Sequence, residues 1–139
     1  MRKGVAVGTT EWREKLPFYG KHPFPPEAKK CIKVDQTVRL PWLIGERNKM
    51  FVEYLVSTDR MHSGIFRLAP NSYDDPSPPH KGDELFYVLQ GSGVLLVDDE
   101  DYYLVHQGEA FYLPAGHRHQ WFNCFGDEFV VLWVVAPEL

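Results

Sequence analysis

From residue 50 onward the chain is divided into short apolar segments separated by turn-forming residues. The breaks contain glycine, proline, asparagine or aspartate, and they recur roughly every 8 to 12 residues without a long helical period. This punctuation predicts an all-β antiparallel sandwich or barrel over residues 51–139. The apolar segments are 51–57, 65–69, 85–89, 94–97, 102–105, 110–113, 120–122 and 129–136.

Residues 1–50 differ from this pattern because they are rich in proline and aromatic residues. Dense proline excludes long helices and central strands. Exposed aromatic side chains are costly, so the segment is expected to pack over an apolar surface. We therefore expect an amino-terminal arm over residues 1–50, packed on the barrel or on a partner subunit, with one short strand near residues 31–40.

The last apolar segment, 129–136, is apolar at both alternating positions. Because successive side chains of a strand point to opposite faces, neither face of this strand is expected to be solvated. One face should meet the arm or a partner subunit. We therefore predict a homodimer.

Length and charge exclude several classes of function. The chain has 139 residues, which fit one domain, and 15 Lys and Arg against 19 Asp and Glu give a net charge of −4. With no long basic stretch, we expect no nucleic-acid partner. The longest apolar run is far short of the roughly 20 residues of a membrane helix, and the amino terminus lacks the apolar run of a signal peptide. We expect a cytoplasmic protein without a membrane partner.

The two cysteines, Cys31 and Cys124, are far apart and form no CxxC pair. Neither a disulfide framework nor a cysteine zinc cluster is therefore indicated. Any metal site must come from histidines and carboxylates.

Two stretches carry residues suited to such a site. In the first, His80 precedes Glu84 by four positions, and Glu84 shares a strand face with Phe86 and Val88. A carboxylate on that apolar face is costly unless a positive group meets it. In the second, a turn made by Pro114 and Gly116 leads into a strand whose period of two places His119, Trp121 and Asn123 on one face.

These stretches resemble the two motifs of the cupin family. The resemblance covers about residues 60–136. The first motif consists of H-x-H, then three or four residues, then E-x6-G. This chain matches it at Glu84, at Gly91 and at one histidine, His80. The second motif, G-x5-P-x-G-x2-H-x3-N, is matched at Gly108, Pro114, Gly116, His119 and Asn123.

The resemblance implies a single jelly-roll barrel with a metal site in its interior. In metal-binding cupins these motifs hold one divalent ion, commonly iron, manganese, nickel or zinc, so His80, Glu84 and His119 are the candidate ligands. One histidine of the family pattern is missing, and either Pro78 or Gly82 stands in its place.

Other residues carry weaker hypotheses. Phe86 and Trp121 share the parity of Glu84 and His119 and are candidates for binding a substrate, although aromatic residues in a small barrel are commonly plain core. His62 is a candidate replacement ligand, with an exposed turn residue as the alternative.

Two functions follow from the resemblance. One is a metal-dependent enzyme with dioxygenase, isomerase or lyase chemistry on a small organic molecule. The other is a non-catalytic cupin that binds or senses a small molecule. The residues left in the first motif favour the enzyme, and its missing histidine favours the binding module.

Overall fold

The computed structural model describes residues 38–44, 49–58 and 60–137, and the regular elements in them are all β-strands. Among these residues, no helix has the length and apolarity needed to cross a membrane. The strands are β1 (Val38–Ile44), β2 (Lys49–Ser57), β3 (His62–Leu68), β4 (Ser72–Tyr73), β5 (Asp83–Gln90), β6 (Ser92–Val97), β7 (Asp101–His106), β8 (Ala110–Leu113), β9 (His119–Asn123) and β10 (Phe129–Ala136).

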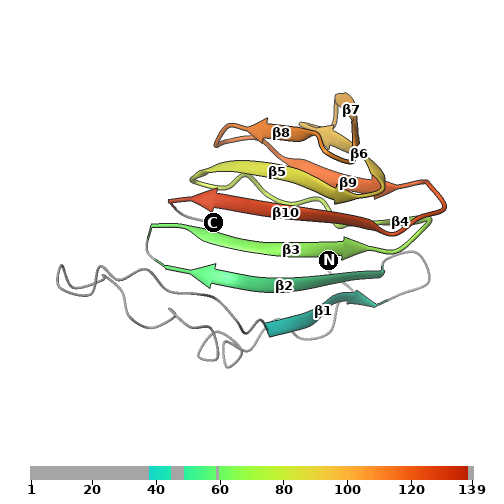
Figure 1. The fold of residues 1–139 in the computed structure, drawn as a ribbon. Helices are drawn as coiled ribbons and strands as arrows, with labels where there is room; N and C mark the ends of the chain where they lie inside the picture. Colours follow the sequence, from blue (N-terminus) through green and yellow to red (C-terminus); the bar gives the residue numbers. More distant parts are fainter. Residues whose placement is uncertain (1–37, 45–48, 59, 138–139) are drawn as a thin grey trace.

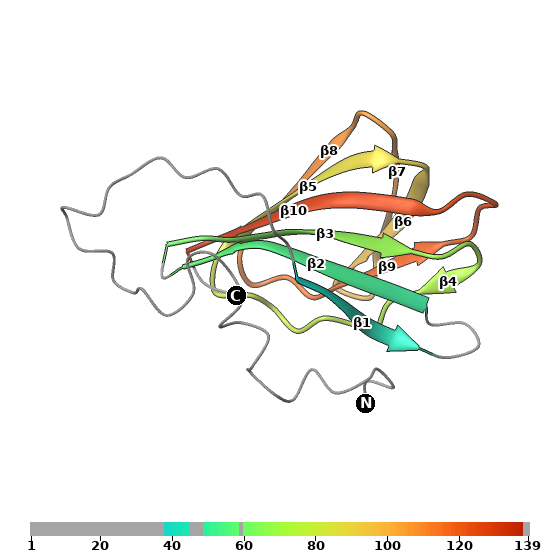
Figure 2. The same ribbon diagram turned by 60° about the horizontal axis from the view of Figure 1, so that its bottom comes forward.

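The strands form two sheets in which the paired strands are antiparallel (Figure 1). The larger sheet has the order β1-β2-β3-β10-β5-β8, and the smaller has the order β4-β9-β6-β7. Consecutive strands are neighbours at β1-β2-β3 and at β6-β7, whereas β10 lies between β3 and β5, and β9 lies between β4 and β6. Figure 2 shows the chain crossing between the two layers. The all-β jelly-roll fold expected from the sequence is confirmed.

The observed strands follow the apolar segments closely. The segments 110–113 and 129–136 coincide with β8 and β10, and most other strands extend one or two residues beyond their segment. The short strand β4 lies in the stretch 71–79, where the sequence indicated only a break. Strand β1 lies among the residues expected to form the arm and pairs with β2. The rest of the arm, residues 1–37, lies outside the described residues.

The core lies between the two sheets and is built around aromatic side chains. Trp121 on β9 meets Phe86 on β5 edge to face, with ring centroids 5.1 Å apart, and it meets Phe129 on β10 at the same centroid distance. Phe66 on β3 lies 6.0 Å from Trp121. These contacts join strands of different sheets, so the aromatic residues set the spacing between the layers.

Candidate metal centre

Glu84 is directed inward by the alternation of β5. Glu84, Phe86 and Val88 are buried, whereas Leu85 and Tyr87 between them are exposed. Asp83, the preceding residue, accepts hydrogen bonds from the Tyr112 hydroxyl (2.7 Å) and from the backbone N–H of Ala115 (2.9 Å). The start of β5 is thereby tied to the turn that precedes β9, and the predicted inward face of this strand is confirmed.

His119 is positioned by the turn before β9 and by pairing with a distant loop. Gly116 in this turn has φ +92°, a conformation that L side chains rarely adopt, which explains the glycine. His119 itself exchanges backbone hydrogen bonds with Ser77, at 2.7 Å and 3.3 Å. The buried face of β9 consists of His119, Trp121 and Asn123, as the period of two predicted.

His80 lies in the loop before β5, and its carbonyl accepts a hydrogen bond of 3.2 Å from the backbone N–H of Gly116. The same turn thus holds the loop of His80 and leads into His119. The two imidazole rings are brought to a centroid separation of 5.4 Å.

The three side chains converge on a single point in the interior. Glu84 Oε1 lies 3.3 Å from His80 Nε2 and 3.6 Å from His119 Nε2. One ligand atom from each residue lies within 4.8 Å of the others. Two imidazoles and one carboxylate form a donor set suited to iron, manganese, nickel or zinc.

Hydrogen bonding and burial also fit a cation at this point. Glu84 is only 5% exposed, and its Oε1 has no hydrogen-bond partner among the described residues. An unpaired buried carboxylate oxygen is costly, and a cation between it and the two imidazoles would remove that cost. His80, Glu84 and His119 could therefore hold a metal ion.

Burial shifts the protonation of two of these groups in opposite senses. Burial raises the pKa of Glu84 above its usual value, although the contact with His80 opposes the shift. Burial, followed by the proximity of His80, lowers the pKa of His119 to about 3. His119 is therefore a neutral imidazole at neutral pH, which is the form that binds a metal.

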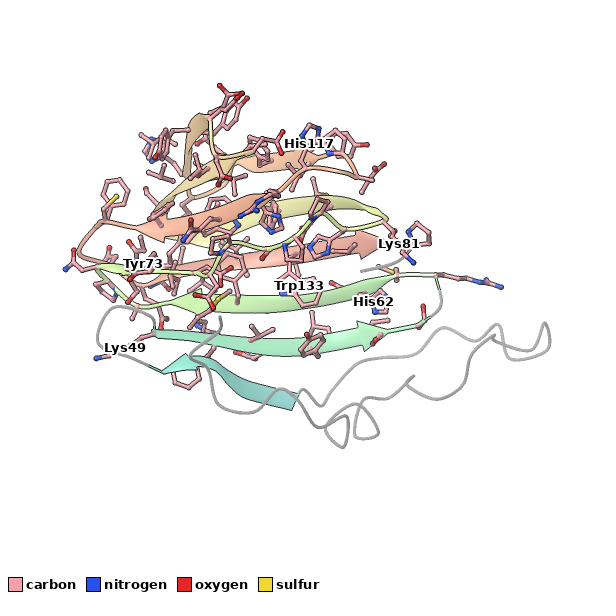
Figure 3. All side chains as sticks on the ribbon, turned by 180° about the vertical axis from the view of Figure 1, so that it is seen from behind. Lys49, His62, Tyr73, Lys81, His117 and Trp133 are labelled. Atoms are coloured by element: carbon pink, nitrogen blue, oxygen red, sulfur yellow. The ribbon has the colours of Figure 1, made fainter. Side chains whose placement is uncertain are left out.

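The three side chains line a cavity of about 290 Å³. Phe86 and Trp121, the candidate substrate-binding residues, line it too, and so does Trp133, which Figure 3 shows on β10. Sequence reasoning missed Asp74 and Ser77, both buried and both in the lining. They belong to a loop whose proline and aspartate residues indicate a solvated segment. Backbone pairing of Asp74 with Trp121 and of Ser77 with His119 brings this loop inside.

The lining indicates which residue replaces the missing histidine. Pro78 lines the cavity beside His80 and Glu84, whereas Gly82 is not among its lining residues. This placement supports the alignment in which His80 is the second histidine of the first motif and Pro78 stands at the position of the first.

Among the described residues, the remaining histidines lie apart from this group. The His62 ring accepts or donates a hydrogen bond of 2.8 Å with Ser57 Oγ. His62 is the first residue of β3, and Figure 3 shows it at that end of the strand. His62 pairs with Val135, which pairs with Glu84, so two strand spacings of about 4.8 Å separate His62 from Glu84. His117 lies 2.6 Å from the Asp98 carboxylate at the surface.

The side chain of Asn123, the last residue of the second motif, makes hydrogen bonds to backbone groups. Its Nδ2 donates to the carbonyls of Leu68 (3.0 Å), Ala69 (3.1 Å) and Asp127 (2.8 Å). Its Oδ1 accepts from the backbone N–H of Phe125. The amide therefore joins the end of β9 to the end of β3 and to the turn before β10.

Comparison with known proteins supports this architecture, although no curated protein matches the chain. A cupin 2 conserved barrel domain protein from Rhodopseudomonas palustris is 20% identical with a TM-score of 0.63, over 73% of this chain and 72% of that chain. A protein described as a predicted oxalate decarboxylase from Thermotoga maritima is 17% identical with a TM-score of 0.63, over 77% and 98%.

The Cnp3 cupin domain of Schizosaccharomyces pombe is 15% identical with a TM-score of 0.59. That match covers 63% of this chain and 64%, just under two thirds, of that chain. At such identities these structures show a shared fold alone. The family description "Cupin domain" matches residues 64–135, which is more than half of the chain. The chain therefore belongs to the cupin family.

Proposed function

We propose that this cupin is a metal-dependent enzyme that acts on a small organic molecule inside the barrel. The observation that carries the proposal is the convergence of His80 Nε2, Glu84 Oε1 and His119 Nε2, with Glu84 Oε1 buried and without a hydrogen-bond partner among the described residues. Iron, manganese, nickel or zinc suits this donor set. The proposed reaction is a dioxygenation, an isomerisation or a lyase reaction.

The cavity limits the substrate. Its volume of about 290 Å³ lies near the lower end of the range for ligand pockets, roughly 300–1,000 Å³. Phe86 and Trp121 offer apolar contact on the walls, and Asp74 and Ser77 add polar groups. These features support a small molecule with both an apolar and a polar part.

The residues of the chain have distinct tasks in this proposal. His80, Glu84 and His119 hold the ion, which when bound would polarise a carbonyl or activate dioxygen according to its identity. The burial that keeps His119 neutral also keeps its lone pair available at neutral pH. The aromatic walls orient the substrate and exclude water.

Metal content tests the assignment. Protein produced without a histidine tag should contain about one transition-metal ion per chain by element analysis, and His119→Ala should lose it. His106→Ala is the matched control, because His106 is exposed and bonds Ser92 at the surface. Unchanged metal content in His119→Ala would reject the ligand set.

The second candidate is a cupin that binds or senses a small molecule without catalysis. The observation in its favour is Pro78, which lines the cavity where the family pattern has a histidine and supplies no ligand atom. Protein purified free of metal that still binds a small molecule in this cavity would favour the binding module over the enzyme.

A further inference from the structure

Two aromatic side chains outside both sequence motifs form a corner in the cavity wall. Tyr54 on β2 and Trp133 on β10 line the cavity and are 5% and 6% exposed. Their ring centroids lie 5.4 Å apart, and their planes are almost perpendicular, at 86°. We name this pair the aromatic corner. Neither residue is a candidate ligand, so the proposed metal site does not account for it.

The aromatic corner depends on Gly64, which lies between its two members. In the larger sheet, Gly64 on β3 pairs with Tyr54 on one side and with Trp133 on the other. A Cβ atom at Gly64 would lie 2.6 Å and 2.9 Å from two atoms of the Trp133 indole. The indole therefore packs on the Gly64 backbone beside β3 (Figure 3). A side chain at Gly64 would displace the indole, so the glycine lets it lie against the sheet and leaves the interior open.

A second perpendicular pair adjoins the aromatic corner. Phe86 pairs directly with Trp133 across β5 and β10, and its ring meets that of Trp121 at 85° with centroids 5.1 Å apart. Phe86 and Trp121 both line the cavity. Perpendicular rings present an edge and a face, and a further aromatic ring makes favourable contacts with both. Two such pairs therefore suit an aromatic ring better than a saturated one.

The aromatic corner is close enough to the candidate ligands for one small molecule to reach both. Trp133 pairs with Phe86, which follows Glu84 by two positions on the same face of β5. Diagonal neighbours of this kind are about 7–8 Å apart. A single ring with one substituent can span such a distance. A ring packed against Trp133 would therefore direct a substituent toward Glu84.

The polar and apolar parts of the lining are separated. The inward residues of β2 that line the cavity, Met50, Val52 and Tyr54, supply apolar atoms apart from the Tyr54 hydroxyl. Strands β3 and β10 separate β2 from β5. The polar lining residues lie on β5, on β9 or in the loop between β4 and β5, and they are Asp74, Ser77, His80, Glu84 and His119. A ligand that fits has its apolar body toward β2 and its polar group toward the candidate ligands.

The volume of the cavity fits one ring. An apolar cavity of roughly 150 Å³ already accepts benzene, and this cavity has about 290 Å³. We infer that the substrate of the proposed enzyme carries a single aromatic ring, bound at the aromatic corner, with an oxygen substituent directed toward His80, Glu84 and His119. This inference rests on the proposed function, which makes the bound molecule a substrate.

Titration of the unsubstituted protein with phenol and cyclohexanol tests the preference for an aromatic ring. The two probes share a six-membered ring and one hydroxyl group and differ in aromaticity. In protein freed of metal by a chelator, phenol should bind at least about tenfold more tightly, because it makes aromatic contacts that cyclohexanol lacks. Equal affinities in calorimetry, or no binding of phenol at roughly 10 mM, would overturn the inference.

The same titrations in the presence of zinc separate this inference from the proposed metal site. A preference for phenol with and without zinc, in protein that binds zinc through the ligand set, supports both. A preference for phenol in protein that binds no metal would reject the metal site and leave the ring subsite in place. Zinc bound through the ligand set without a preference for phenol would reject the ring subsite alone.

Substitution of Trp133 tests the aromatic corner itself. Trp133→Leu should lower the ratio of the phenol affinity to the cyclohexanol affinity about fivefold, and Trp133→Phe, which keeps a ring, should restore most of it. Both probes bind the same folded molecules, so partial unfolding cancels in this ratio, and a purely structural role of Trp133 would leave it unchanged.

Tyr102→Leu is the matched control, because Tyr102 is 68% exposed on β7 of the other sheet. It should leave the ratio of affinities unchanged. If Trp133→Leu does not fold by circular dichroism, Tyr54→Leu removes the other ring of the corner and should lower the ratio in the same way. A folded variant of either kind with the ratio of the unsubstituted protein would overturn the inference.

Discussion

Replacing Glu84 by glutamine should change stability in opposite directions with and without metal. Without metal, Glu84 is buried and its Oε1 lacks a hydrogen-bond partner among the described residues. The pKa of Glu84 is higher in the folded protein than in the unfolded chain. Glu84 therefore contributes to stability below the usual carboxyl pKa of about 4.3, and this contribution is lost as the pH rises through the pKa of the folded state. At pH 8 the carboxylate therefore opposes folding, whether it stays ionised or takes up a proton.

Glutamine has the same shape and no charge, so Glu84→Gln should stabilise the metal-free protein. Removal of a poorly compensated buried charge is worth on the order of 1–2 kcal/mol. At roughly 3–5 °C per kcal/mol for a chain of this size, the Tm should rise by about 5 °C.

With metal, the order of stabilities should reverse. An ion present at 100 times its dissociation constant stabilises the native state by about 2.7 kcal/mol, which corresponds to roughly 10 °C in Tm. Glu84→Gln removes the only carboxylate of the donor set and should lose most of this gain.

Calorimetric melts at pH 8, with chelator and then with manganese or zinc, measure both effects. Glu128→Gln is the control, because Glu128 is at the surface, 3.4 Å from Arg67. It should change stability by less than about 0.5 kcal/mol and keep the full metal shift. The reasoning fails if Glu84→Gln melts below the parent protein in chelator, or if its metal shift equals that of the parent.

Three further predictions follow from the contacts described above. Asn123→Asp places a carboxylate among three carbonyl oxygens and should cost about 3–5 kcal/mol in urea unfolding at pH 8. Gly91→Ala puts a Cβ 2.6 Å from a carbonyl at φ +77° and should cost about 2 kcal/mol, whereas Gly126→Ala, with open space around it, should be nearly neutral. In metal-free Glu84→Gln protein, stability should fall as the pH drops from about 6.5 toward 3, because the unfolded chain protonates at His119 before the native state does. Adding His119→Gln should remove the part of that fall that begins near the usual histidine pKa of about 6.5 in urea titrations, and leave the fall at lower pH to which Asp83 and Asp98, with their lowered pKa values, contribute.

Local periodicity was sufficient to predict the parts of the site that lie on strands. Glu84 and Phe86 occupy alternate positions of β5, and His119 and Trp121 occupy alternate positions of β9. Because successive side chains of a strand point to opposite faces, residues two positions apart point to the same face in any strand. The structure therefore places all four on the cavity, as the sequence predicted.

Residues outside strands could not be predicted in this way. Asp74 and Ser77 are inside because backbone pairs form between residues more than 40 positions apart, from Asp74 to Trp121 and from Ser77 to His119. A pattern of neighbouring residues does not indicate a pairing between such distant positions. The proline and aspartate residues around Asp74 and Ser77 indicate a solvated loop instead. The choice between Pro78 and Gly82 depended on the same loop and needed its path in three dimensions.

The geometry of the ligand set follows from the packing of the core. Glu84 lies on β5 of the larger sheet and His119 lies on β9 of the smaller one, so no single ladder of hydrogen bonds fixes their separation. Glu84 and His119 are each two residues from an aromatic side chain on the same strand face, Phe86 and Trp121 respectively. The ring centroids of these two aromatic residues lie 5.1 Å apart across the sheets. Because a packed interior resists compression and expansion, this contact holds the ligand atoms at the distance that an ion would bridge. A bound ion would in turn link the two sheets, which is why metal occupancy should be visible in the stability of the whole barrel.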